Sequence, residues 1–393
     1  MKGTGKIKIC VLTSTRADWG LLMPLARALR SAEDVKLQIV ASNMHLIPEL
    51  GMTVNEIVAS GFEVDRCVDC HIAGDDDLSR ARTMARCLEG TAEALCDLHP
   101  AAVIILGDRY EMLASASAAA IMHVPIIHIA GGEISEGALD DSFRHAITKL
   151  ATLHLTATEP YRRRVIQMGE APERVVNTGA IGVWNAFNTP LKSADELGSE
   201  LGVDFNGKVI AVTFHPATNE ASVTPEEQID ALLDALDRFP DVTAVITAPN
   251  NDAGGAYILK RLEEYAASRP ERVRLVRSLG MVRYQSLLRY VRAVVGNSSS
   301  GIVEAPSAGV PTVDIGVRQQ GRLAGPSVLH CSAQADAIER CMREAFSDEM
   351  RSLAAKRINP YYKPDTLALM EEAVLAFVRS LPVPPKHFYD IER

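Results

Sequence analysis

The stretch 131–149 reads GGEISEGALDDSFRHAITK and gathers several carboxylates with an arginine, a histidine and a lysine. Carboxylates held close together push one pKa upward, so one residue type can supply both an acid and a base. Two glycines allow the chain to turn sharply before Glu133. Asp108 ends a neighbouring apolar run, where a carboxylate without a partner is costly. We expect Asp108, Glu133 and Asp141 to converge and to move a proton.

A helix is expected from Asp140, whose carboxylate suits the N-cap position. Its apolar residues recur at i, i+4 and i+7 and predict one face packed on a sheet: Phe143, Ile147 and Leu150. Asp141 and His145 lie about 160° from that stripe, one turn apart. This charged face meets either solvent, where the pair contributes roughly 0.2–0.5 kcal/mol, or a ligand. Spacing alone leaves both interpretations open.

The segment GNSSSGIVEAPSAGVP places small polar residues between an apolar run and a predicted helix. We expect the helix to begin near Gly301, so that its first backbone N–H groups bind an anion. Serine hydroxyls would add to this phosphate cradle: Ser298, Ser299 and Ser300. Glu304, one turn into the helix, either accepts from sugar hydroxyls or balances the helix dipole.

Three further candidates lie near other apolar runs. Arg318 and Arg322 flank one run and would neutralise a diphosphate, unless they are ordinary surface arginines. His215 is either a satisfied histidine at a strand end or a ligand-binding one. A serine hydrolase is not indicated, because the chain has no G-x-S-x-G turn.

The elements that position these residues are apolar runs alternating with amphipathic stretches. The runs are KIKICVLTST, VKLQIVAS, AAVIILGD, VPIIHIAGG, LHLTAT, KVIAVTFHP, TAVITAPN, RVRLVRS, RAVVGNSSS and PTVDIGV. Continuous apolar runs of this kind are typical of parallel strands covered on both faces. The pattern occurs twice, around the polar junction NTPLKSADELGSELGVDFNGK. We predict an α/β protein with two Rossmann-like, doubly wound domains facing each other across a cleft.

The domain boundaries follow from that junction. We expect an N-terminal domain over residues 1–185 and a C-terminal, nucleotide-binding domain over 186–365. Ligands of such sheets bind outside the carboxyl ends of the strands. The candidates that follow apolar runs are Arg16, Asp108, Arg109, Glu133, His215, Asn250 and Ser298 to Ser300.

Composition narrows the partners. The chain has 393 residues, with 50 acidic and 41 basic side chains and a net charge of −9, which disfavours nucleic acid or an anionic membrane as partner. No secretory signal and no run of about eighteen apolar residues occurs, so we expect a cytoplasmic protein. Seven cysteines suggest reduced thiols. Cys67 and Cys70 form a C-x-x-C pair without the second half of a zinc site, so no metal is expected.

Six motifs, in order, resemble the hydrolysing UDP-N-acetylglucosamine 2-epimerase family, the bacterial enzymes of sialic-acid and related nonulosonic-acid synthesis. They are TSTRADWGLLMPL, GDRYEML, GGEISEGALDDSFRHAITK, TFHPAT, PNNDAGG and GNSSSGIVEAPSAGVPTVDIG. The resemblance implies a glycosyltransferase-B type fold, with a final helix at about 366–393 packing back on the first domain. It also implies conversion of UDP-N-acetylglucosamine and water to N-acetylmannosamine and UDP through a glycal-like intermediate.

The resemblance also assigns roles to residues. The catalytic residues would be Asp108, Glu133, Asp141 and His145. The nucleotide sugar would be held by Arg16, Arg109, Arg144, His215, Asn250, Ser298, Ser299, Ser300, Glu304, Arg318 and Arg322. Glu304 would bind the ribose and the serines the phosphates. No cofactor is implied, in keeping with the missing G-x-G-x-x-G, and a homodimer or homotetramer is expected.

Two alternatives to this reaction stay open at this point. The same chemistry on a UDP- or GDP-linked 2,4-diacetamido-trideoxyhexose, the legionaminic-acid route, would use the same residues. A glycosyltransferase would bind the nucleotide with the same residues and transfer the sugar to an acceptor. A non-catalytic sensor is disfavoured, because binding a diphosphate gains nothing from three nearby carboxylates.

Overall fold

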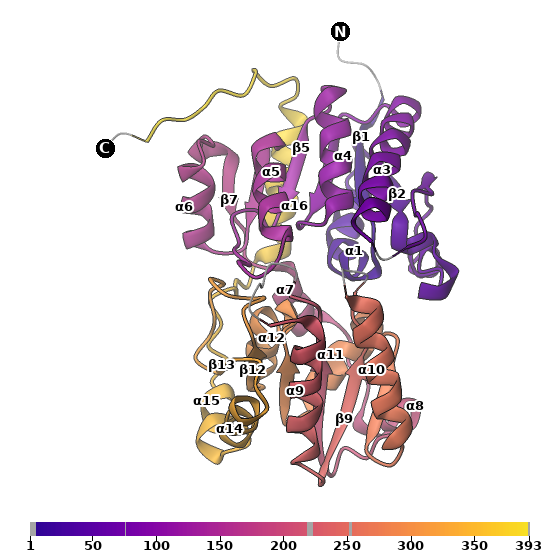
Figure 1. Cartoon of the computed structure of the whole chain (residues 1–393). Helices are drawn as coiled ribbons and strands as arrows, with labels where there is room; N and C mark the ends of the chain where they lie inside the picture. The colour runs from indigo at the N-terminus through magenta and orange to yellow at the C-terminus, as the bar shows by residue number, and fades with distance from the viewer. Residues whose placement is uncertain (1–4, 75, 218–222, 251–253, 392–393) are drawn as a thin grey trace. The chain divides into compact units, whose positions relative to one another are not determined.

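The computed structural model describes residues 5–74, 76–217, 223–250 and 254–391. Residues 251–253 of the PNNDAGG motif and residue 218 of TFHPAT therefore lie outside the described residues. The chain divides into two compact units (Figure 1). Unit 1 comprises Met1–Glu133, Asp140–Ile181 and Lys363–Arg393, and unit 2 comprises Ile134–Leu139 and Gly182–Tyr362.

Unit 1 is built on a seven-stranded parallel sheet in the order β3-β2-β1-β4-β5-β6-β7. Its strands are β1 (Ile7–Thr13), β2 (Val35–Ser42), β3 (Arg66–Val68), β4 (Ala102–Leu106), β5 (Ile126–Ile129), β6 (Leu153–Thr156) and β7 (Val175–Asn177). The strand order reverses beside β1, so the connections that follow β1 and β4 run in opposite directions and leave an opening between them. An opening of this kind is where doubly wound sheets bind ligands.

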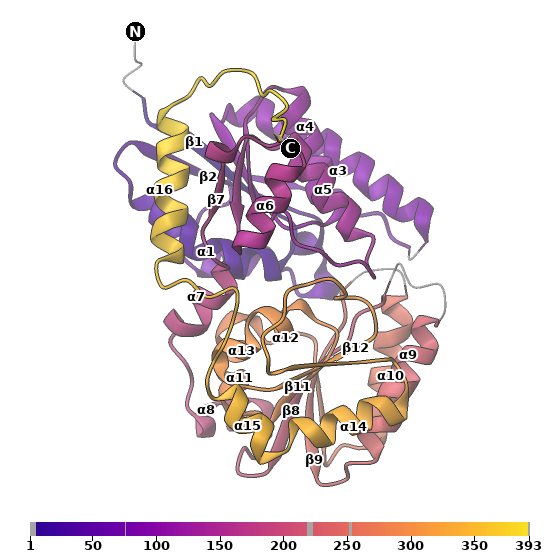
Figure 2. The same cartoon turned by 90° about the vertical axis from the view of Figure 1, so that its left-hand side faces the viewer.

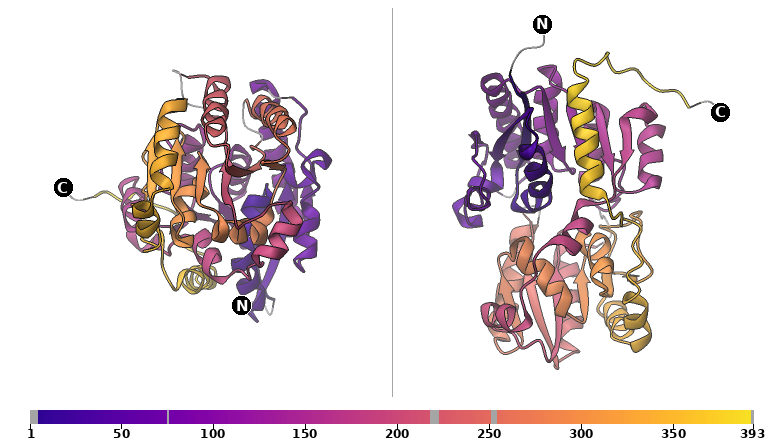
Figure 3. Two further views of the ribbon diagram at one scale, coloured as in Figure 1. Left: turned by 90° about the horizontal axis from the view of Figure 1, so that it is seen from below. Right: turned by 180° about the vertical axis from the view of Figure 1, so that it is seen from behind.

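Helices cover both faces of this sheet. They are α1 (Arg16–Ser31), α2 (Val54–Ala59), α3 (Asp77–Leu98), α4 (Tyr110–Ile121), α5 (Asp140–Leu150), α6 (Glu159–Gln167), α7 (Ile181–Asn188, which continues into unit 2) and α16 (Thr366–Arg379). Side chains of α3, α4 and α5 form one core with the sheet. The final helix α16 packs beside α1 (Figures 2 and 3). Arg379 of α16 is paired with Asp34, with 2.8 Å between Nε and Oδ2.

Unit 2 is built on a six-stranded parallel sheet in the order β10-β9-β8-β11-β12-β13. Its strands are β8 (Lys208–Thr213), β9 (Val242–Thr247), β10 (Val273–Val276), β11 (Ala293–Gly296), β12 (Thr312–Ile315) and β13 (Val328–Cys331). The order reverses beside β8. The carboxyl ends of β8 and β11 therefore form the corresponding opening in this sheet.

The helices of unit 2 also lie in two layers. They are α8 (Ala194–Leu201), α9 (Pro225–Asp237), α10 (Gly255–Ser268), α11 (Gly280–Tyr290), α12 (Ser299–Val303), α13 (Ala305–Ala308), α14 (Ala335–Ala345) and α15 (Asp348–Ala354). One core joins the sheet to α9, α10 and α14. A second joins it to α8, α11 and α13. Each face is buried, which explains why the strands read as continuous apolar runs.

The predicted fold class, two parallel-sheet α/β domains, is confirmed, and each of the ten predicted runs contains a strand. Three strands were missed: β3, β7 and β13. All three are three or four residues long and lie at sheet edges, where half-exposed residues break the apolar pattern. No helix in the described part of the chain is long and apolar enough to cross a membrane.

Candidate functional site

In unit 1, two adjacent strands deliver acidic residues at their carboxyl ends. Asp108 follows β4 after Gly107, whose φ of +82° turns the chain sharply. Glu133 follows β5 after two glycines, and its side chain is buried, with 6% exposed. Helix α5 adds Asp141, Arg144 and His145. Asp108, Glu133, Asp141, Arg144 and His145 are called the Arg144 cluster below.

A buried guanidinium holds this cluster together. Arg144 is 1% exposed and is ion-paired with Asp108 through Nη2. Its Nη1 lies 3.3 Å from Asp141 Oδ1 and donates to the Glu133 carbonyl oxygen at 3.1 Å. Asp108, Asp141 and the Glu133 main chain therefore take their positions from one side chain. Bonds to a charged donor of this kind are stronger than neutral ones.

The predicted orientation of α5 is wrong in part. The helix begins at Asp140 itself, and its buried residues are Arg144, Ile147 and Thr148. Leu150, expected in the apolar stripe, is 36% exposed. The inward face is thus centred on a charged residue, which is acceptable because the guanidinium has acidic partners. A pattern based on apolar residues cannot detect this arrangement.

Asp141 and His145 form the pair expected from their spacing, with 3.4 Å between Asp141 Oδ2 and His145 Nε2. Their side chains are 23% and 32% exposed, so the pair is neither a core pair nor a fully solvated one. Burial lowers the pKa of His145, although Asp141 opposes the shift. The neutral ring is therefore favoured at pH 7. Its Nδ1 is buried and has no hydrogen-bond partner among the described residues.

His128 supports this cluster from the sheet and was not predicted. It is fully buried on β5, and burial lowers its pKa to about 3. Its Nε2 lies 2.8 Å from the Gly107 carbonyl oxygen and its Nδ1 lies 3.2 Å from Thr148 Oγ1. Because a carbonyl only accepts, Nε2 carries the proton. This neutral ring ties the turn before Asp108 to α5.

Arg109 is held by an acidic residue that the sequence analysis also missed. Its Nε and Nη2 lie 3.2 and 3.3 Å from the two carboxylate oxygens of Glu111, a fork-to-fork pair. Glu111 is fully buried and also accepts from the side chain of Asn43. Arg16, by contrast, starts α1 and makes a half-exposed pair with Glu56 at 3.7 Å.

In unit 2, polar residues link the carboxyl ends of adjacent strands. His215 follows β8, Asn250 follows β9, Asn297 follows β11 and Gln319 follows β12. These four residues are called the Asn297 cluster below. The backbone N–H of Asn250 donates to His215 Nδ1 at 3.1 Å. Since Nδ1 accepts, a neutral His215 carries its proton on Nε2 and can donate it to a ligand.

The serine segment differs from the expected anion cradle. Helix α12 begins at Ser299, two residues before Gly301, and is only five residues long, so its dipole is small. Ser298 is the N-cap residue. The hydroxyl of Ser300 lies 3.1 Å from that of Ser298 and 2.6 Å from that of Tyr284. The serine hydroxyls are thus ordered by one another and by a tyrosine.

Glu304 stands between two short helices, α12 and α13, instead of inside one helix. Its backbone N–H donates to the Ser300 carbonyl oxygen. Burial raises the pKa of Glu304 to about 7. Gly182 lies against its carboxylate, where a Cβ atom would overlap Glu304 Oε1. Glu304 is thus the N-cap residue of α13, where its side chain makes no capping hydrogen bond, and it does not lie in the first turn of α12.

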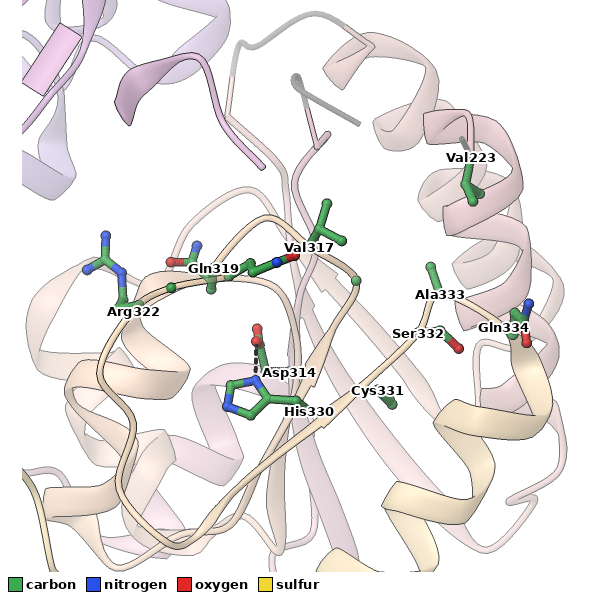
Figure 4. A pocket seen from close by; sticks show the side chains of 13 residues that line it. Val223, Asp314, Val317, Gln319, Arg322, His330, Cys331, Ser332, Ala333 and Gln334 are labelled. Carbon is green, nitrogen blue, oxygen red and sulfur yellow. Dashed lines mark hydrogen bonds and ion pairs between the residues drawn. The ribbon is translucent and has the colours of Figure 1, made fainter. Parts of the chain in front are cut away.

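The loop after β12 carries the last two predicted arginines. Arg318 Nη1 donates to the Asn297 carbonyl oxygen at 3.4 Å. Arg322 and Gln319 line a hollow of about 620 Å³, shown in Figure 4. Asp314 and His330 lie across it from that loop, 2.9 Å apart, and this contact raises the pKa of His330. The structure thus places the two arginines in different surroundings.

The predicted residues accordingly fall into two groups. Unit 1 brings together Asp108, Glu133, Asp141, Arg144 and His145, with Arg109 beside Asp108 in sequence and Arg16 on α1. Unit 2 brings together His215, Asn250 and Arg318 around Asn297, and contains Ser298 to Ser300, Glu304 and Arg322. All seven cysteines are free thiols, and the described residues contain no group of His, Cys, Asp and Glu arranged to hold a metal.

Comparison with known proteins identifies relatives of this chain. Residues 27–374 match the family model of UDP-N-acetylglucosamine 2-epimerase. A Campylobacter jejuni protein, GDP/UDP-N,N'-diacetylbacillosamine 2-epimerase (hydrolyzing), is 37% identical over 82% of this chain and 84% of its own. Polysialic acid biosynthesis protein P7 of Escherichia coli is 33% identical over 98% of this chain and 97% of its own.

Solved structures show the same fold. The UDP-GlcNAc 2-epimerase of Neisseria meningitidis, crystallised with UDP-GlcNAc, superposes with a TM-score of 0.78 at 17% identity, over 94% of this chain and 100% of that one. This likeness confirms the predicted glycosyltransferase-B type fold class. The family model and the relatives confirm the resemblance drawn from the motifs. The chain belongs to the UDP-N-acetylglucosamine 2-epimerase family.

Proposed function

We propose that this protein is a hydrolysing nucleotide-sugar 2-epimerase that converts UDP-N-acetylglucosamine and water to N-acetylmannosamine and UDP. The observation that carries the proposal is the Arg144 cluster. One buried guanidinium holds two aspartates, and the chain turns at Glu133 beside them. Proton removal from a carbon needs acids and bases held within hydrogen-bond reach of the reacting atoms.

The chemistry divides into two balanced steps. A carboxylate takes the proton from C2 while the C1–O bond to UDP breaks, which leaves a C1–C2 double bond in a glycal-like intermediate. Water then adds its oxygen to C1, and a proton returns to C2 on the opposite face. Asp108, Glu133 and Asp141 are the carboxylates proposed for these transfers. His145 Nδ1, which lacks a partner among the described residues, is proposed to contact the sugar or the water.

Arg144 takes a different role in this scheme from the one its motif implies. With 2% of its side chain exposed and its guanidinium shared by acidic groups, it has little surface left for a ligand. We assign it a positioning role, in which its charged donors hold Asp108 and Asp141 in place. Arg109, anchored on Glu111, and Arg16 remain the proposed sugar-nucleotide contacts of unit 1.

Unit 2 is proposed to bind UDP. His215 Nε2–H, the hydroxyls of Ser298 to Ser300 and the two arginines 318 and 322 are donors suited to a diphosphate. Glu304 is proposed to accept from the ribose hydroxyls. The proposed elimination and hydration need no nicotinamide, because no hydride is transferred in either step.

Proton NMR of UDP-N-acetylglucosamine with the purified protein in D₂O tests the proposal. Free N-acetylmannosamine with deuterium at C2, together with UDP, is the expected result, because C2 exchanges its proton with solvent and C1 receives water. UDP release that requires an added acceptor would indicate a glycosyltransferase instead. Epimerised sugar still attached to UDP would contradict the hydrolysing reaction.

A second substrate is suggested by the name of one relative. The Campylobacter relative, 37% identical, is named for N,N'-diacetylbacillosamine linked to GDP or UDP. The same reaction on that sugar would use the same carboxylates, since the chemistry is confined to C1 and C2. Comparing kcat/KM for UDP-N-acetylglucosamine and UDP-N,N'-diacetylbacillosamine decides between them. Activity confined to the diacetamido sugar would overturn our first substrate and keep the mechanism.

A further inference from the structure

A hydrogen-bond network joins four neighbouring strands of the unit 2 sheet at their carboxyl ends. These strands are β9, β8, β11 and β12, which are adjacent in the sheet order. Each contributes one member of the Asn297 cluster: Asn250, His215, Asn297 and Gln319. Only His215 and Asn250 belong to the residues predicted to bind substrate. Asn297 and Gln319 have no role in the proposed function described above.

Asn297 occupies the centre of this network. Its Oδ1 accepts from the backbone N–H of His215 at 2.7 Å, and its Nδ2 donates to the His215 carbonyl oxygen, also at 2.7 Å. Its own backbone N–H donates to the Thr213 carbonyl oxygen at 3.1 Å. The side chain is 1% exposed, so it has no room to contact a ligand itself. It can therefore influence a ligand only through the position of His215.

Gln319 also holds Asn297, through the Asn297 main chain. Its Nε2 donates to the Asn297 carbonyl oxygen at 2.9 Å, and the side chain is 2% exposed. Asn297 also directly precedes the serine segment, so its main chain sets where Ser298 begins. The loop after β12, the serine segment after β11 and His215 after β8 are thus held by one residue.

We propose that Asn297 is a positioning residue for nucleotide binding, which fixes His215 and the serine segment relative to each other so that both address one diphosphate. This inference rests on the proposed function, in which His215 and the serines bind UDP. An amide suits the position because it offers a donor and an acceptor at one end of a short side chain. A carboxylate would face the His215 carbonyl oxygen without a donor, and an apolar side chain would leave both buried main-chain groups unpaired.

Loss of the Asn297 side chain should also affect the imidazole ring of His215. His215 Nδ1 accepts from the backbone N–H of Asn250 only while the His215 main chain stays where Asn297 holds it. Loss of that bond frees the ring to place its proton on either nitrogen. UDP would then meet a donor at Nε2 only part of the time.

The test compares Asn297→Leu with a matched control, Gln228→Leu. Gln228 is a buried amide of α9, 1% exposed, whose Nε2 donates to the Val223 carbonyl oxygen, outside the Asn297 cluster. Two properties are measured: the Kd for UDP by calorimetry, and the ring ¹⁵N shifts of His215 in protein labelled at histidine, assigned with His215→Ala. For Asn297→Leu we expect UDP to bind about tenfold more weakly or worse and His215 to lose its single tautomer. Gln228→Leu should change neither property.

The double variant adds a coupling measurement. If Asn297 acts through His215, adding Asn297→Leu to His215→Ala should weaken UDP binding by less than Asn297→Leu does alone. Fully additive losses would overturn the positioning role. If Asn297→Leu does not fold, Gln319→Leu loosens the same main chain from β12, and unchanged His215 shifts in that variant would also overturn it.

The two readouts separate this inference from the proposed function. Wild-type protein that does not bind UDP contradicts the proposed function, while the His215 shifts still decide whether Asn297 sets the ring. Wild-type protein that binds UDP, with an Asn297→Leu variant of equal affinity and unchanged His215 shifts, contradicts the inference alone.

Discussion

The two units organise their polar residues in different ways. In unit 1 the Arg144 cluster is held by a charged side chain that joins two aspartates. In unit 2 the Asn297 cluster is held by neutral amides that join main-chain groups. A guanidinium holds carboxylates close together, as proton transfer from carbon requires. Amides do not titrate, so the bonds by which Asn297 holds the His215 main chain do not depend on pH.

The largest effect is expected from removing charge at the proposed acids and bases. Asp108→Asn, Glu133→Gln and Asp141→Asn should each lower kcat by roughly 10²–10⁴-fold, because positioned proton transfer contributes about that much. UDP affinity should stay near that of the wild type, since none of these three carboxylates is assigned to UDP binding. Steady-state kinetics and calorimetry measure both quantities. Full turnover in Asp108→Asn and Glu133→Gln would show that the catalytic assignment is wrong.

The centre of the Arg144 cluster should also matter for stability. Arg144→Met removes the cation between Asp108 and Asp141 and should lower the free energy of unfolding by about 3 kcal/mol. Urea unfolding measures this change. The matched control is Arg66→Met, which breaks an exposed pair with Asp97 at 3.1 Å and should cost no more than about 1 kcal/mol. Equal costs for the two variants would show that the Arg144 cluster is an ordinary surface network.

Glu304 differs from the neutral amides of unit 2, because its carboxyl group titrates. Its pKa is raised by burial from an ordinary value of 4.5 to about 7. The protonated acid is favoured in the folded state, so its contribution is fully present below pH 4.5 and is lost as the pH rises toward 7. Glu304→Gln should therefore show a shallower fall of Tm between pH 5 and about 7 than the wild type. Identical pH profiles would show that Glu304 titrates normally.

The smallest effect concerns the turns that follow two comparable strands. In unit 2, Gly296 ends β11 at φ +138°, where a Cβ atom would overlap the Thr213 carbonyl oxygen. In unit 1, Ala130 follows β5 at φ +67°, a left-handed conformation that is strained for alanine. Ala130→Gly should stabilise the protein by about 0.5 kcal/mol, because the relieved strain exceeds the entropy that glycine loses on folding.

The control for this variant is Ala85→Gly, at an exposed position of helix α3. It should destabilise the protein by about 1 kcal/mol, since glycine lowers helix propensity. Thermal unfolding of both variants gives the sign of each change. Destabilisation by Ala130→Gly would indicate that the methyl group at this turn contributes more packing than strain.

Much of this protein could be predicted before its structure. The ten strands inside apolar runs, the two α/β units and the placement of Asp108, Glu133, His215 and Ser298 after strands all follow from local patterns. Strand and turn signals depend on a few neighbouring residues and change little with the rest of the chain. The motifs also identified the family, because they name residue types and spacings without requiring a geometry.

Tertiary structure alone decided which polar residues are buried and what they hold. Arg144 was expected to contact a ligand and is instead 1% exposed and tied to Asp108 and Asp141. Glu111, His128 and Asn297 were not predicted. Asn43, one partner of Glu111, is 68 residues away, and His128 and Asn297 bond to main-chain groups. Ile134–Leu139 likewise groups with unit 2, where the Glu136 N–H donates to the Gln320 carbonyl oxygen at 3.2 Å.

The physical reason is the range of the forces involved. Periodicity reports which face of an element meets other apolar residues, and that depends on near neighbours along the chain. The position of a buried charge or amide depends on finding every partner it needs, and those partners come from separate strands. The sequence by itself determined the sheets, the turns and the candidate residues at the strand ends. Only the tertiary structure decided that Arg144 and Asn297 are buried next to those residues and hold them in place.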